Sequence, residues 1–180
     1  FMQEAGTDAV KVEGGVNAAH IVSAIVRAGI PVVGHIGLTP QHISQLGGYK
    51  AQGTDLETGS RVIEDALAVE KAGAFAIILE CVPGQISRIV TERLKIPTIS
   101  YGAGIHCDGQ GLVAHDILGI FDRFTPKFVK KYSNLGQQIQ GAFEEYVDDV
   151  VSQQFPGDEH TFHIKKDQLD AVIKRNSQIG

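Results

Sequence analysis

The sequence predicts an α/β protein in which parallel strands alternate with helices, and three observations carry this prediction. Helical stretches end three times in Ala-Gly, an apolar extended segment follows each of them, and polar side chains stand where these segments end. Glycine suits the position after a helix because it adopts left-handed backbone angles without a Cβ penalty. Segments that are apolar throughout are typical of parallel strands buried on both faces. The alternation therefore indicates βαβ units.

The expected elements come in a repeating order along the chain. Residues 1–5 read as the last turn of a helix that Gly6 ends. A helix is expected over residues 56–72, where apolar residues recur at helical spacing and form one stripe, and another near residues 85–94. The expected strands lie at residues 8–13, 31–36, 74–80, 97–101 and 111–114.

Two architectures fit this alternation: an open doubly wound sheet and a closed barrel. Polar residues at the ends of successive strands favour the barrel, whose functional groups gather at that rim. Such a barrel has eight strands in about 250 residues, whereas this chain has 180 residues. We therefore expect a (β/α)8 TIM barrel with only about the last five strands present. Because Phe1 is not a usual translation start and lies inside an expected helix, the first three strands are expected upstream.

The pattern changes after Pro126. The expected elements there are a helix, a break and a short amphipathic helix, at residues 137–153, 155–157 and 167–174. We expect one domain, residues 1–180, with βα units over residues 1–126 and a helical segment over residues 127–180. The apolar side of the first tail helix would pack either against a neighbouring subunit or across the bottom of the barrel.

Composition argues against several classes of protein. The net charge is −5 and no basic run exceeds two adjacent lysines, so nucleic acid is not an expected partner. No apolar run reaches membrane-spanning length, and residues 1–5 lack the features of a signal peptide. The two cysteines do not have the spacing of a metal-binding pair, so reduced thiols in a cytoplasmic protein are expected.

Charged side chains stand at the ends of three consecutive expected strands. Side chains alternate along a strand, so Lys11 and Glu13 share one face. His35 stands at the end of the next strand, and Glu80 at the end of the one after it. A buried charge is costly unless it pairs, binds a metal or contacts a ligand. His35 or Glu80 alone could be structural, but the four together predict a site that binds a divalent metal, holds a carboxylate and moves a proton.

The same residues fall within longer motifs. The motifs are D-A-V-K-V-E-G-G at residues 8–15, G-H-I-G-L-T-P-Q at residues 34–41, G-G-Y-K-A-Q-G at residues 47–53 and L-E-C-V-P at residues 79–83. Shorter ones follow at residues 102–104, 107–110 and 126–128. Together they resemble the ordered motifs of the ketopantoate hydroxymethyltransferase (3-methyl-2-oxobutanoate hydroxymethyltransferase) family. The resemblance runs from Asp8 to about His163.

This resemblance implies a TIM barrel of the phosphoenolpyruvate/pyruvate type. It implies an enzyme that transfers a hydroxymethyl group from 5,10-methylenetetrahydrofolate to 3-methyl-2-oxobutanoate, giving 2-dehydropantoate for pantothenate and coenzyme A biosynthesis. It also implies a metal-stabilised enolate, with Mg²⁺ or another divalent metal, and a homo-oligomer, commonly a decamer. By resemblance, Glu80 is the catalytic base, Lys11 and His35 bind the substrate, and Glu13 belongs to the metal site, whose other ligands are expected upstream of Asp8.

The chain departs from the family pattern in two ways. Residues 99–104 read I-S-Y-G-A-G where the family has I-G-I-G-A-G, so Ser100 and Tyr101 are expected to add bulk near the rim. The family's two aspartate metal ligands have no counterpart here, so these 180 residues alone are expected to be inactive. Two alternatives stay open: a related metal-dependent 2-oxo acid lyase or mutase, and a non-catalytic relative with a vestigial site.

Overall fold

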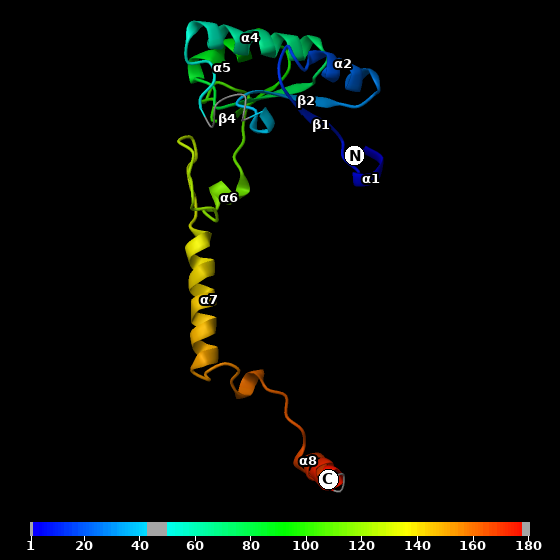
Figure 1. The fold of residues 1–180 in the computed structure, drawn as a ribbon, viewed down its shortest axis with the longest axis vertical. Coiled ribbons are helices and arrows are strands. Elements are labelled where there is room, and N and C mark those ends of the chain that lie inside the picture. Colours follow the sequence, from blue (N-terminus) through cyan, green and yellow to red (C-terminus); the bar gives the residue numbers. More distant parts are fainter. Residues whose placement is uncertain (1, 43–49, 178–180) are drawn as a thin grey trace. The chain divides into compact units, whose positions relative to one another are not determined.

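The computed structural model describes residues 2–42 and 50–177, so the first three residues of the motif at residues 47–53 lie outside the described residues. The chain divides into two compact units, Phe1–Tyr132 and Ser133–Gly180. In the described residues, the first unit holds a parallel sheet with its helices and the second holds helices (Figure 1).

Four of the expected strands and the helices expected over residues 56–72 and 85–94 are confirmed to within two residues. The strands are β1 (Val10–Glu13), β2 (Val32–Gly37), β3 (Ala76–Glu80), β4 (Thr98–Tyr101) and β5 (Gly109–Gln110). The helices are α1 (Met2–Ala5), α2 (Ala19–Arg27), α4 (Leu56–Lys71), α5 (Gly84–Arg93) and α6 (Ala114–Ile117), with a 3-10 turn η1 (Pro40–His42).

The strand expected over residues 111–114 is wrong. β5 ends earlier, and Gly111 continues its pairing by donating its N–H to the Ser100 carbonyl at 2.8 Å. α6 then begins at Ala114, a strong helix former, and Gly119 follows this helix with a φ of +64°. Local helix chemistry therefore outweighs the short apolar run that suggested a strand.

The five strands are parallel and stand in chain order, which confirms the α/β fold with a parallel sheet. Figure 1 shows α2, α4 and α5 together on one side of this sheet. An open doubly wound sheet reverses its strand order and carries helices on both faces. Within residues 2–42 and 50–132 the strand order is not reversed, and α2, α4 and α5 share one side, which favours the wall of a barrel. Closure of the barrel stays a prediction.

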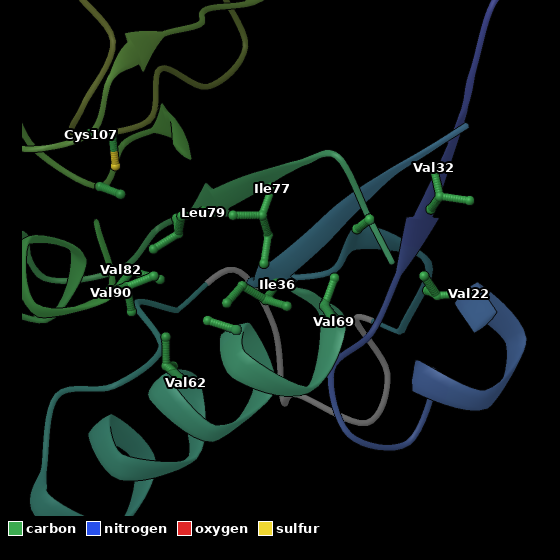
Figure 2. Packing of buried hydrophobic residues seen from close by; sticks show 13 residues of the cluster. Val22, Val32, Ile36, Val62, Val69, Ile77, Leu79, Val82, Val90 and Cys107 are labelled. Atoms are coloured by element: carbon green, nitrogen blue, oxygen red, sulfur yellow. The ribbon is translucent and has the colours of Figure 1, made fainter. Parts of the chain in front are cut away.

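The hydrophobic core lies between these helices and the sheet (Figure 2). Its helix and strand residues include Val22, Val62, Val69, Val90, Val32, Ile36, Ile77 and Leu79. Full burial of a side chain of this size contributes about 1.5–3 kcal/mol. Gly34 lets α4 approach the sheet closely, because a Cβ there would lie 2.3 Å from Cγ1 of Val69.

The opposite face of the sheet has less cover in the described residues. Val33, Ile78 and Ile99 are only half-buried there. The expectation that the strands are buried on both faces is therefore not met on this face. The register pairs Val33 with Lys11 and Ile78 with His35, which places the charged strand ends on this same face. The more open face therefore carries the candidate site.

The second unit consists of α7 (Leu135–Val151), the 3-10 turn η2 (Asp158–His160) and α8 (Lys166–Asn176), and both expected tail helices are confirmed to within two residues. The Phe155 ring contacts the rings of Tyr146 and His160, with centroid distances of 5.7 and 5.1 Å. Along α7, Phe143 and Val147 are exposed, and what this apolar side packs against stays a prediction. No helix in the described part of the chain is long and apolar enough to cross a membrane.

Candidate active site

The structure brings the four predicted site residues together at the ends of three neighbouring strands. Paired residues of parallel strands point to the same face, and the register pairs Glu13 with His35 and Gly37 with Glu80. The Lys11 Nζ atom lies 3.7 Å from Oε1 of Glu13. The same oxygen lies 3.6 Å from Nδ1 of His35, whose Nε2 lies 3.0 Å from Oε2 of Glu80. The histidine thus lies between two carboxylates.

His35 is almost fully buried, with 2% of its side chain exposed. Its contact with Glu80 has the length of a hydrogen bond but not the direction, so neither ring nitrogen has a hydrogen-bond partner among the described residues. An unsatisfied buried polar group is rare and calls for a partner such as water, an ion or a ligand. The ring is therefore positioned to bind something that occupies this site.

The two carboxylates differ in their surroundings. Glu13 is 5% exposed, and its Oε2 accepts a hydrogen bond from the Gln41 N–H at 3.1 Å, which ties it to η1. Glu80 is 20% exposed and lines an open cavity. Glu13 is therefore held in place by the protein, whereas Glu80 is available to a ligand.

The backbone around Glu80 is unusual on two neighbouring strands. Gly37 has a φ of +87°, and a Cβ there would lie only 2.4 Å from the Glu80 carbonyl oxygen. That oxygen accepts a hydrogen bond from the Leu38 N–H at 2.8 Å. Cys81 has a φ of +52°, which is strained for a residue with a side chain. Its N–H donates to the Tyr101 carbonyl at 2.9 Å, which helps to hold this conformation.

Cys81 lines the cavity next to Glu80 and is half-buried. Burial and, to a smaller extent, the negative charge of Glu80 raise the pKa of its thiol to about 11. The thiol is therefore protonated and uncharged at neutral pH. This agrees with a small, inert lining residue.

A cavity of about 1710 Å³ opens on the site face of the sheet. Small-molecule sites usually measure about 300–1,000 Å³, so the space exceeds that of a small acid alone. Lys11, His35 and Glu80 line its polar part. Phe121 and Phe124 line its apolar part, and no sequence motif singled them out. Their only signal is a run of aromatic residues in an irregular segment after the last strand.

The two substitutions in the I-S-Y-G-A-G segment have different effects. Ser100 points to the helix-covered face, is 1% exposed, and its Oγ accepts a hydrogen bond from the Ala103 N–H at 2.9 Å. It therefore holds the turn after β4, and the expectation that it adds bulk near the rim is wrong. Tyr101 lies on the open face and lines the cavity, so its ring does add bulk beside Glu80.

The donor set for a divalent metal is incomplete in the described residues. Within residues 2–42 and 50–177, no three His, Cys, Asp or Glu side chains are placed to hold one ion. The oxygens of Glu13 already contact Lys11, His35 and the backbone of Gln41. The described residues alone thus do not fit a complete metal site, and the role of Glu13 as a metal ligand stays a prediction.

Comparison with known proteins adds independent information. The sequence model of a family described as ketopantoate hydroxymethyltransferase matches residues 1–158. The 3-methyl-2-oxobutanoate hydroxymethyltransferase of Carboxydothermus hydrogenoformans is 51% identical over 172 residues, which cover 96% of this chain and 62% of the relative. The enzyme of the same name from Heliobacterium modesticaldum is 54% identical over 162 residues, covering 90% and 59%. The chain spans about three fifths of the length of these curated relatives.

Proposed function

The chain belongs to the ketopantoate hydroxymethyltransferase family, and from this we propose that the protein transfers a hydroxymethyl group from 5,10-methylenetetrahydrofolate to 3-methyl-2-oxobutanoate. The product is 2-dehydropantoate, used in pantothenate biosynthesis. The observation that carries the proposal is the position of His35 between the Glu13 and Glu80 carboxylates at the floor of a large cavity.

We assign the chemical roles by exposure and charge. Glu80 is the general base that removes the C3 proton of the 2-oxo acid, because its carboxylate faces the cavity. Lys11 binds the substrate carboxylate, because its side chain is about half-exposed and lines the same space. The electron pair left at C3 then forms the new carbon–carbon bond to the methylene carbon of the folate. The two bonds from that carbon to the folate nitrogens break, a water molecule supplies the hydroxyl oxygen, and tetrahydrofolate leaves.

His35 and Glu13 hold this arrangement in place. The imidazole nitrogens of His35 have no hydrogen-bond partner in the described residues, so one is available to an oxygen of the bound acid. Glu13 holds its position through the backbone of Gln41 and balances the charge of Lys11. We retain Glu13 as a proposed donor to a divalent metal, with the other donors in the part of the relatives' length that this chain does not span.

We also propose that the five-stranded sheet is part of a (β/α)8 barrel. Support comes from its uninterrupted strand order and from helices that cover one face. A barrel interior would bring the charged strand ends to one rim, where enzymes of this fold have their active sites. A homo-oligomeric assembly, with a decamer as the expected form, belongs to the same proposal.

The test is product formation by the complete gene product that carries this sequence. The protein should form 2-dehydropantoate only when both 3-methyl-2-oxobutanoate and 5,10-methylenetetrahydrofolate are present. E80Q removes the base and should lower kcat by about 10²–10⁴-fold. E92Q is the matched control, because Glu92 is exposed and pairs with Arg88 on the surface of α5.

Other outcomes would contradict the proposal in specific ways. Cleavage or rearrangement of 2-oxo acids without folate would identify a related lyase or mutase. Binding of the acid without turnover would identify a non-catalytic relative. Equal activity of E80Q and E92Q would remove Glu80 from the role of base while leaving the family assignment intact.

A further inference from the structure

Tyr101 lies beside the proposed base on the neighbouring strand. The register pairs Tyr101 of β4 with Glu80 of β3, so both side chains point to the open face. Neighbouring strands lie about 4.8 Å apart. Both residues line the same cavity. The phenol ring is thus next to the position where the substrate's reacting carbon would meet Glu80.

The ring also has a defined position relative to β5. A Cβ built on Gly111 would lie 2.2 Å from Cε2 and 2.3 Å from Cζ of Tyr101, so the ring occupies the space directly over this glycine. Gly111 does not have left-handed backbone angles. Glycine at this position therefore leaves room for the ring. The backbone conformation itself would allow a residue with a side chain.

We propose that Tyr101 is a specificity-determining residue, whose ring closes the cavity beside Glu80 and limits the size of the branch at C3 of the bound 2-oxo acid. This inference rests on the proposed function, because it assumes that a 2-oxo acid binds next to Glu80. Gly111 supports the same role by leaving the ring its place over β5.

The experiment compares two acids that differ by one methylene in the branch, 3-methyl-2-oxobutanoate and 3-methyl-2-oxopentanoate. Their dissociation constants are measured by titration calorimetry on the complete gene product. Y101A should shift the ratio of the two affinities toward the longer acid by about tenfold, the usual effect of one methylene in an apolar pocket. Y101F keeps the ring and should leave the ratio unchanged.

A second variant tests the position of the ring without removing it. G111A places a methyl group where the ring lies, pushes the ring toward the cavity, and should weaken the longer acid more than the shorter one. G141A is the matched control, because a Cβ at Gly141 in α7 has no atom within 4 Å. Circular dichroism establishes that each variant is folded before its affinities are compared.

The outcomes separate this inference from the proposed function. If the wild-type protein binds neither acid, the proposed function fails and the inference fails with it. If the wild-type protein binds the shorter acid and a folded Y101A keeps the wild-type ratio, Tyr101 does not set specificity, while the proposed function stands. A shift in Y101A and G111A, with none in Y101F and G141A, supports the inference.

Discussion

His35 is the residue on which the geometry of the site depends. Its ring lies between Glu13 and Glu80 at 3.6 and 3.0 Å, and it is 2% exposed. The ring therefore separates the carboxylate of Glu13, which the backbone of Gln41 holds, from that of Glu80, which faces the cavity. Glu80 is thus the carboxylate within reach of a bound substrate, which a general base must be.

Cys81 gives a prediction at the same scale. Its pKa is raised from the ordinary 9.0 to about 11, first by burial and then by the charge of Glu80. A raised pKa keeps the thiol protonated as the pH rises, so near pH 8 its thiolate fraction is about 100-fold below that of an unperturbed thiol. Iodoacetamide should therefore alkylate Cys81 at least about tenfold more slowly in the folded protein than in urea. Peptide mass mapping over time measures both rates.

Equal rates of Cys81 alkylation in the folded and unfolded protein would contradict a buried thiol with a raised pKa. Raising the pH toward 11 should speed the reaction in the folded state, because the thiolate then forms. Cys107 provides a second thiol in the same sample; it is buried, whereas Cys81 is half-buried and lines the cavity.

At the scale of elements, the ends of β2 and β3 are fitted together through Gly37. This glycine has a φ of +87°, and a Cβ would lie 2.4 Å from the Glu80 carbonyl oxygen. The position therefore needs glycine for two reasons, the left-handed backbone and the close approach of another strand. The second reason links the end of β2 to the residue proposed as the base.

G37A and G29A separate these two effects. Gly29 follows α2 with a φ of +83°, but a Cβ there would have no atom within 4 Å. G29A should therefore cost only the backbone term, about 1–2 kcal/mol of the free energy of unfolding. G37A should cost about 1–3 kcal/mol more, because the methyl group forces the strand ends apart. Urea denaturation of both variants measures the difference, and equal losses would show that the close approach to Glu80 is absent.

At the scale of the whole molecule, much of the parallel sheet could be predicted from the chain. Ala-Gly helix ends and apolar strands mark four of the five strands because both signals are local. Side-chain alternation places Lys11 and Glu13 on one face. The parallel pairing of the strands then places His35 and Glu80 beside them on the same face. These features depend on backbone periodicity, which the sequence expresses directly.

Other features depend on contacts between distant residues and could not be predicted. The strained backbone of Cys81 is held by a hydrogen bond from its N–H to the carbonyl of Tyr101, 20 residues away in sequence (101 − 81). Ser100 and Tyr101 point to opposite faces because side chains alternate along a strand. Which of the two shares the face of Glu80 follows from the pairing of β3 with β4, which a single segment does not reveal. The aromatic side of the cavity depends on how an irregular segment folds back after β5, and no periodic signal describes such a segment.

The central claim, that Glu80 removes the C3 proton of 3-methyl-2-oxobutanoate, has a direct test that needs no folate. Proton NMR in D₂O follows the loss of the C3–H signal in the presence of the complete gene product, with a protein-free sample as the baseline. The wild-type protein should exchange this proton for deuterium, and E80Q should do so about 10²–10⁴-fold more slowly. Exchange by E80Q at the wild-type rate, or product formation by the wild-type protein without exchange above the baseline, would contradict the claim.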